Sequence, residues 1–270
     1  NSEEKPRLLK PKRNYIYTAN HRHWPKDATF HGGQAYSDSF RGLKINEMLK
    51  SNSKHDSTSF RNIQCDKEAT DARYFVPLMI EKLKLLSPNS VVDKTIALFT
   101  NWDFIMSKNC HACGVYRRWL DLLDIKWKTE EPGTYRLIKS IGVSSPYTSL
   151  NLQSDFLTSL NQAWNDTSNR KWGELHLNPF RHLSLVENNL DQNLVFSPEL
   201  ATEGDAHSID PGSAKWDEKR KIYEHYSGAS MRMVIEMHPK KPRIWLSLPG
   251  KNKNYDSYTA KEDYVWQNWV

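Results

Sequence analysis

The sequence predicts an α+β protein, with helices in its first half and β-strands near its C-terminus. Apolar residues recur at helical spacing in several segments between residues 40 and 165. Two segments after residue 225 alternate instead between polar and apolar residues, as half-buried strands do. Helices followed by strands, rather than a regular alternation of the two, are typical of the α+β class.

The predicted helices begin with residues 40–50, where Leu43, Met48 and Leu49 contribute to an apolar face and Ser39 is a candidate N-cap. The longest helical pattern covers residues 66–86. Pro77 lies inside it, which predicts a kink or a split because proline removes a helical hydrogen bond. Further helices are predicted over residues 91–102, 115–123 and 156–164.

Three strands are predicted from alternation. The first is the short β-prone segment 15–19, which precedes a loop rich in His, Gly, Asp and Ser. The other two are residues 230–237 and 243–248, joined by a short segment with a proline at each end. We expect these two to pair antiparallel, with Val234 and Trp245 in the protein interior.

Charge and hydropathy restrict the class of protein. A net charge of +6 and a pI of about 9.0 are compatible with nucleic-acid binding. Acidic residues are interleaved with the basic ones, however, so a solvated surface of mixed sign is the favoured interpretation. The mean hydropathy is −0.75, and no apolar run is long enough to predict a membrane span. Residues 1–13 are charged and contain no apolar stretch typical of a signal peptide.

The chain has three cysteines, an odd number that argues against a simple disulfide framework. Cys110 and Cys113 form a C-x-x-C with His111 between them. A single C-x-x-C is a weak zinc motif, and a thioredoxin-like role would need a βαβ context that the sequence does not predict. The favoured interpretation is two thiols in a helical region, one turn apart, either bridged or simply packed.

Several short blocks occur in order along almost the whole chain. The first two are YTANHR at 17–22 and FRGLKINEML at 40–49. The other blocks are QCD at 64–66 with Pro77 after it, WD at 102–103 with Trp119, WGELH at 172–176 with His182, GD at 204–205 with Ser208, SGASMR at 227–232, and Trp266. Together the blocks resemble the penicillin acylase family, in which the first corresponds to a TANNR strand and the second to an arginine-bearing helix.

The resemblance implies that residues 1–270 are the C-terminal portion of the β-chain of an N-terminal nucleophile hydrolase, which has an αββα sandwich. The helical region would cover roughly 40–165, and roughly 225–270 would return to the sheet. In such enzymes a precursor cleaves itself, a newly N-terminal Ser attacks a linear amide, and its own α-amino group is the base. No such Ser begins this chain, so we expect the chain alone to be inactive.

The same resemblance implies partners, substrates and location. The partners would be the α-chain and the N-terminal β-chain segment of the same precursor, and a small-molecule amide substrate, such as a penicillin, a cephalosporin or an acyl-homoserine lactone. We expect no nucleic acid, membrane, metal or other cofactor for this segment, since the family's calcium-ligating region lies elsewhere. The expected location is periplasmic or extracellular.

Individual roles are also implied by the matching positions. Asn20 corresponds to the family's oxyanion-stabilising Asn, and Arg41 to the arginine that supports the active site; a side-chain amide is a suitable neutral donor for an oxyanion. An arginine at a helix start opposes the helix dipole, which favours a tertiary partner for Arg41. Substrate-pocket candidates in the loop are His21, His23, Trp24 and Phe30, with His31 beside them.

Other interpretations remain open at this point. His176 and His182 are better interpreted as structural histidines near Trp172 than as metal ligands, because their spacing fits no helix-borne zinc pair. A member that has lost catalysis and kept the fold as a binding or scaffolding module is the first alternative function. A basic nucleic-acid-binding protein is the second.

Overall fold

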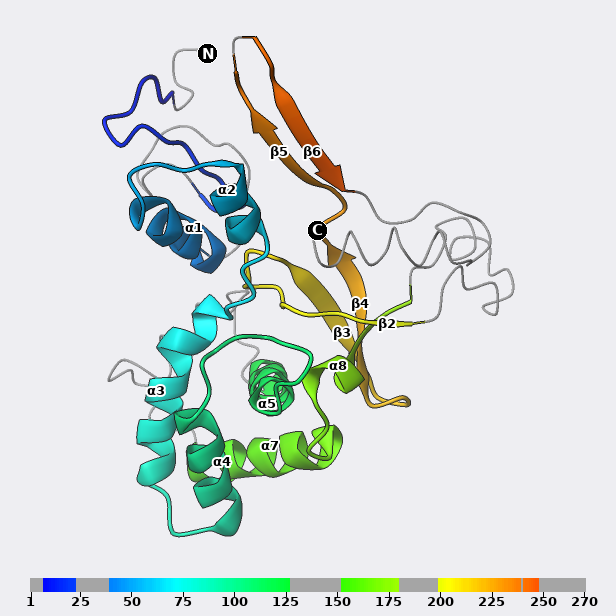
Figure 1. Ribbon diagram of the computed structural model, residues 1–270. Helices are drawn as coiled ribbons and strands as arrows, with labels where there is room; N and C mark the ends of the chain where they lie inside the picture. The colour runs from blue at the N-terminus through cyan, green and yellow to red at the C-terminus, as the bar shows by residue number, and fades with distance from the viewer. Residues whose placement is uncertain (1–6, 23–38, 127–151, 180–198, 239, 248–270) are drawn as a thin grey trace, which may run out of the picture.

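The computed structural model describes residues 7–22, 39–126, 152–179, 199–238 and 240–247 (Figure 1). In the order of the chain, all the described helices come first and the described strands follow. The predicted α+β class is therefore confirmed.

Each predicted helix is present. The described helices are α1 (Phe40–Lys50), α2 (Ser57–Gln64), α3 (Thr70–Lys84), α4 (Ser90–Thr100), α5 (Ala112–Lys126), α7 (Leu152–Thr167) and α8 (Trp172–Leu175). Helix α1 has the predicted bounds, but Ser39 makes no side-chain cap hydrogen bond, so its predicted capping role is wrong. Helix α2 was not predicted. It begins with a capping box in which Asp56 accepts a hydrogen bond from the Ser59 backbone N–H at 2.8 Å.

Of the two outcomes predicted at Pro77, the split is excluded: one helix runs through Pro77 from Thr70 to Lys84. One face of the helix is completely buried on both sides of the proline, including Phe75 and Met79. Residues 66–69, predicted as part of this helix, instead bond to the loop before α5. Ala69 N–H donates to the Phe104 carbonyl at 2.9 Å, and this pairing fixes where α3 begins.

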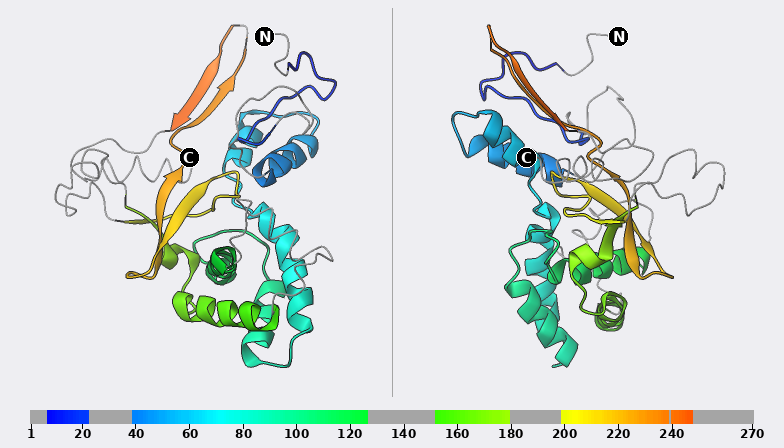
Figure 2. Two further views of the ribbon diagram at one scale, coloured as in Figure 1. Left: turned by 180° about the vertical axis from the view of Figure 1, so that it is seen from behind. Right: turned by 45° about the vertical axis from the view of Figure 1, so that its right-hand side comes forward.

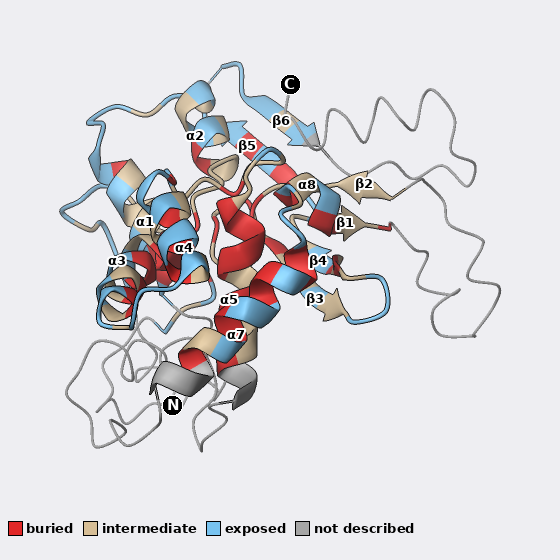
Figure 3. Ribbon diagram, turned by 90° about the horizontal axis from the view of Figure 1, so that it is seen from below, coloured by how far each residue is buried: buried red, intermediate tan, exposed pale blue. Residues whose placement is uncertain are grey.

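Helix α5 lies at the centre of the molecule, between α7, α3 and the larger sheet, and its inner residues are buried (Figures 1 and 3). Its Trp119 is fully buried, with ring centroids 4.5 Å from Phe156 of α7 and 6.2 Å from Phe99 of α4. Aromatic side chains bury about 150–250 Å² each, which is worth about 4–6 kcal/mol apiece on the area scale. This cluster therefore holds the helical region together.

The larger sheet contains β1 (His176–Asn178), β2 (Leu200–Ala201), β3 (Gly212–Asp217) and β4 (Ile222–Gly228), in the order β2-β1-β4-β3. Strands β1 and β4 are parallel, and the two outer pairs are antiparallel. The alternation pattern did not predict this sheet. Strands β1 and β2 are too short to alternate, and they depend on pairing with segments far away in the chain.

His176 is a structural histidine, as predicted. Its ring is buried and stacks on Trp172, with centroids 4.5 Å apart. The Thr202 hydroxyl lies 3.0 Å from Nδ1, and Nε2 lies 3.1 Å from the Gly212 carbonyl. The Thr202 carbonyl also lies 3.1 Å from Nδ1, so a neutral ring donates to one of the two carbonyls and uses its other nitrogen as an acceptor. Accordingly, burial lowers the pKa of His176 to about 3.

The predicted C-terminal hairpin is confirmed as β5 (Arg232–Glu236) and β6 (Arg243–Ser247), which pair antiparallel with Val234 opposite Trp245. Val234 is buried as expected, but Trp245 is only half-buried, so its predicted interior position is wrong. The physical reason is that β5 packs against α2, whereas β6 is an edge strand of a sheet with two strands among the described residues. Figure 2 shows the hairpin extending away from the larger sheet. The Gln64 side chain, at the end of α2, donates to the Met233 carbonyl of β5 at 2.8 Å.

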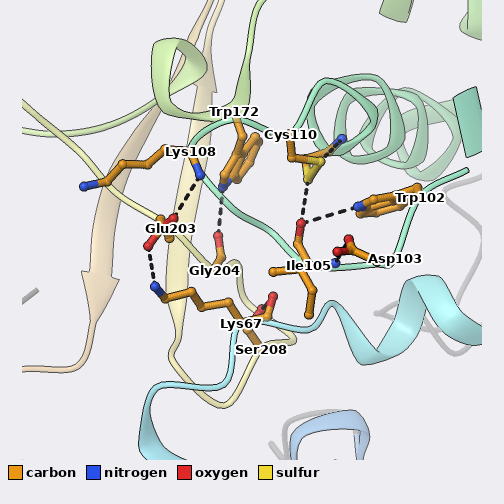
Figure 4. The surroundings of a disulfide bond; sticks show 11 residues. Lys67, Trp102, Asp103, Ile105, Lys108, Cys110, Trp172, Glu203, Gly204 and Ser208 are labelled. Carbon is orange, nitrogen blue, oxygen red and sulfur yellow. Dashed lines mark hydrogen bonds and ion pairs between the residues drawn. A yellow bond between two sulfur atoms is a disulfide. The ribbon is translucent and has the colours of Figure 1, made fainter. Parts of the chain in front are cut away.

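A disulfide joins Cys110 and Cys113 at the start of α5, which settles the choice between bridged and packed thiols (Figure 4). The preceding loop is a junction between distant segments. The backbone N–H of Trp172 donates to the Cys110 carbonyl at 2.8 Å, and the N–H of Lys108 donates to the Glu203 carboxylate at 3.0 Å. The disulfide thus lies where α5, α8 and the segment after β2 meet.

Candidate functional site

Asn20 and Arg41 lie against each other, although they are 21 residues apart in the chain. Nη2 of Arg41 donates to Oδ1 of Asn20 at 2.7 Å and to the backbone carbonyl of Ala19 at 3.1 Å. Arg41 therefore has the tertiary partner that its position at a helix start suggested. The burial of this half-buried guanidinium lowers the pKa of Arg41, which nevertheless remains a cation.

Asn20 does not end a strand, contrary to expectation. The segment 15–19 pairs with no strand among the residues that the structure describes, so it forms no ladder there. Asn20 instead lies in a bend with φ of 63°, a left-handed conformation that asparagine tolerates better than most residues. The bend places the Asn20 side chain over the first turn of α1.

The contact with Arg41 determines how the Asn20 amide is oriented. A guanidinium can only donate hydrogen bonds, so the group facing it must be the carbonyl oxygen Oδ1. The Nδ2 group consequently points away from Arg41. The Asn20 side chain is exposed, and Nδ2 donates to no partner within the described ranges. The arrangement presents a neutral N–H donor, held at its other end by a half-buried cation.

Helix α1, which carries Arg41, is fixed on α3 from two sides. On the buried side Phe40 packs on Phe75 with ring centroids 5.9 Å apart. On the outer side Arg73 forms a two-pronged ion pair with Glu47, at 3.0 and 2.8 Å. Bidentate pairs of this kind restrict geometry as well as adding energy. Arg41 is thus presented by a helix that cannot rotate freely.

The end of α1 also binds the segment that leads to Asn20. The Tyr15 hydroxyl donates to Oδ1 of Asn46 at 2.9 Å. Lys44 bonds to Glu68 at 2.5 Å and lies 3.7 Å from Asp66, in the QCD block. The first contact fixes the segment before Asn20 on α1, and the second fixes α1 on the residues just before α3.

His21 is half-buried and stacks on Tyr17, with ring centroids 5.7 Å apart. Its ring lies over the backbone of Gly42, the residue after Arg41. The other predicted substrate-pocket residues, together with His182, lie outside the described residues: His23, Trp24, Phe30 and His31.

A buried charge cluster beside the site was not predicted. Arg117 of α5 is ion-paired to Asp205 and to Asp71 of α3, the latter at 3.1 Å. Burial disfavours the charge of Asp205, but Arg117 more than compensates and lowers the pKa of Asp205. The GD block at 204–205 had singled out one member of this cluster, Asp205. Nothing in the sequence indicated that the partners would come from α3 and α5.

A second buried ion pair joins the hairpin to the helical region. Nη2 of Arg232 donates to Asp210 at 2.6 Å, and Nη1 donates to the Gln64 carbonyl at 3.2 Å. Arg232 ends the SGASMR block, and Gln64 begins the QCD block. Two of the blocks singled out in the sequence are therefore neighbours in space.

Within the described ranges, no group of three or more His, Cys, Asp or Glu side chains is arranged to hold a metal ion. In the same part of the chain, no helix combines the length and apolar character that crossing a membrane requires.

Comparison with known proteins gives one family. The family model described as penicillin amidase matches residues 1–264, which is almost the whole chain. No curated protein matches the sequence.

Proposed function

The chain belongs to the penicillin amidase family of amidohydrolases, and we propose that Asn20 and Arg41 form the oxyanion-stabilising part of its active site. The observation that carries the proposal is the orientation of the Asn20 amide. Its oxygen is held by Arg41 at 2.7 Å, and within the described ranges its N–H group donates to no partner. A donor held in this way needs little reorganisation when charge develops on a substrate.

The reaction proposed is the hydrolysis of a linear amide in two steps. The hydroxyl of an N-terminal Ser, on a segment outside this chain, adds to the amide carbonyl. The Ser α-amino group accepts the hydroxyl proton and passes it to the leaving amine. Water then attacks the resulting ester, releasing the acid and restoring the Ser. In each step a tetrahedral oxyanion forms, and Asn20 Nδ2 donates a hydrogen bond to it.

Within this scheme the roles are distinct. Asn20 is the catalytic residue, because it touches the reacting oxygen. Arg41 is a positioning residue that acts through Asn20. Its positive charge also favours a negative charge developing nearby. The substrate class proposed is an acylated amine, such as the side-chain amide of a penicillin or cephalosporin, or an acyl-homoserine lactone.

The β5–β6 hairpin supports the proposal that further segments of the same precursor complete the fold. Met233 pairs with Leu246 and Ile235 with Ile244 across the two strands. All four side chains are exposed, by 39%, 53%, 45% and 65% respectively. Adjacent exposed apolar side chains on one face of a hairpin favour coverage by another layer. The αββα sandwich would provide that layer.

The proposal is tested with a chromogenic acyl-anilide assay on the intact, processed enzyme. Asn20→Ala removes one oxyanion donor and is expected to lower kcat by about 10²–10³-fold while the protein stays folded. This chain by itself is expected to show no turnover, because Asn20 and Arg41 can stabilise an oxyanion but cannot attack a carbonyl.

Asn14→Ala is a matched control. Asn14 is also an exposed asparagine in the left-handed region, with φ of 60°, but its side chain has no Arg partner in the described structure. The loss of a favourable left-handed residue is thus the same in both variants. Native turnover in Asn20→Ala would remove Asn20 from the mechanism. An intact enzyme without turnover on any acyl-anilide would favour the scaffolding alternative instead.

A further inference from the structure

We propose that His21 and Gly42 form a ring-on-backbone contact that sets the direction of the Asn20 amide, so that both are positioning residues for amide hydrolysis. This inference rests on the proposed function of Asn20. It gives His21 a role that acts through its neighbour in the chain, not through contact with substrate.

The contact follows from two adjacent pairs of residues. On α1, Arg41 and Gly42 are consecutive; on the bend, Asn20 and His21 are consecutive. Arg41 holds Asn20 by a hydrogen bond of 2.7 Å. A Cβ atom at Gly42 would lie 2.7 Å from both Cε1 and Nδ1 of His21 and 3.3 Å from its Cγ. The bend is therefore attached to α1 at two successive points.

Glycine is needed at position 42 for a tertiary reason. Glycine inside a helix is unfavourable relative to alanine, because it loses more backbone freedom on folding. Gly42 is nevertheless buried inside α1. The absence of a side chain allows the His21 ring to lie against the helix backbone. Any other residue would overlap the ring at a distance that carbon atoms do not tolerate.

Turning the His21 ring aside would disrupt a second contact. The ring also stacks on Tyr17, with centroids 5.7 Å apart and planes inclined by 29°. Tyr17 is in turn covered by the Arg13 guanidinium at 5.0 Å from the ring centroid. If the ring keeps its stack on Tyr17, making room for a side chain at position 42 requires the backbone of residues 20 and 21 to move. The Asn20 N–H group would then miss the oxyanion position.

The test uses the intact enzyme and four variants: Gly42→Ala, His21→Ala, the double variant, and Leu43→Ala as control. Leu43 follows Gly42 on α1 and is exposed. We expect Gly42→Ala to fold with a Tm below the native value, because the added methyl group overlaps the His21 ring, and to lose about 10- to 100-fold in kcat, the usual effect of a small misplacement. KM should stay within about threefold, since only a transition-state contact is disturbed. Leu43→Ala should have native kcat and KM.

The double variant separates the contact from a general loss of packing. Removing the ring leaves room for the new methyl group, so the double variant should be no slower than His21→Ala alone. A kcat loss equal to the product of the two single losses would overturn the inference. A rise in KM at native kcat for His21→Ala would also overturn it, because it would indicate substrate contact. If Gly42→Ala fails to fold, His21→Ala decides: lowered kcat supports the inference and native kcat refutes it.

Failure of this inference differs from failure of the proposed function. If Asn20→Ala loses turnover while Gly42→Ala keeps native kcat, only the positioning role is wrong. If Asn20→Ala keeps native turnover, the proposed function and this inference fail together.

Discussion

The substitution Asn20→Asp separates the two ends of the Asn20 amide. Aspartate has nearly the same shape and also tolerates the left-handed conformation. It keeps an acceptor oxygen for Arg41, 2.7 Å away in the native protein. It replaces the Nδ2–H donor, however, with a second carboxylate oxygen. We therefore expect the protein's stability and its turnover to change in opposite directions.

The magnitudes follow from the geometry. Loss of one oxyanion donor lowers kcat by about 10²–10³-fold. Two like charges about 4 Å apart near a protein surface repel by about 4 kcal/mol. Exposure of Asn20 and the neighbouring Arg41 charge reduce this to about 2 kcal/mol, which is about a further 30-fold. Together the two effects should lower kcat by at least about 10³–10⁴-fold. The new ion pair with Arg41 is exposed on one side and stabilises the fold by at most about 1 kcal/mol.

The measurement is kcat for acyl-anilide hydrolysis alongside the free energy of unfolding in denaturant. Asn14→Asp is the control, since Asn14 shares the exposed left-handed conformation without an Arg partner in the described structure. It should change neither quantity by much. Turnover in Asn20→Asp within about tenfold of native would refute the reasoning, because it would mean that no oxyanion approaches this side chain.

Three further predictions concern stability. Burial lowers the pKa of His176 from 6.5 to about 3, so on acidification the unfolded state binds a proton at this residue before the native state does. The free energy of unfolding should therefore be constant above pH 6.5 and fall by about 2 kcal/mol between pH 6.5 and 5. Denaturant titrations should show a smaller fall in His176→Gln. Replacing both Cys110 and Cys113 by Ser should cost roughly 2 kcal/mol, the loop-entropy value for so short a loop, and treatment of the native protein with a reductant should lower Tm comparably. Asp210→Ala leaves Arg232 buried without its carboxylate and should destabilise the native protein by about 3–5 kcal/mol. A Tm within a degree of the native value would show that the ion pair is not needed for stability.

The sequence predicted helices far better than strands, for a physical reason. Helical hydrogen bonds connect residues four apart, so the apolar spacing of residues 40–50 was enough to predict α1. A strand is stabilised by a partner that the local sequence does not identify. The tyrosine-rich segment 15–19 has strand-like alternation but no partner strand in the described part of the chain. Strands β1 and β2 have partners but almost no local pattern.

The candidate site shows the same division. Motif resemblance alone identified Asn20 and Arg41, and the unfavourable position of a cation at a helix start indicated a tertiary partner for Arg41. It could not show which end of the amide faces the guanidinium. That depends on a contact between a bend and a helix, and only folding brings the two together.

The sequence by itself determined the class of the fold, the helix positions and the residue types available for chemistry, because these depend on local spacing and side-chain identity. Only the tertiary structure decided that the Asn20 bend is left-handed and that His21 lies on Gly42. It also decided that Arg117 joins two acids from different parts of the chain. These features depend on distances between segments remote in sequence, and such distances are set by the packing of the whole core.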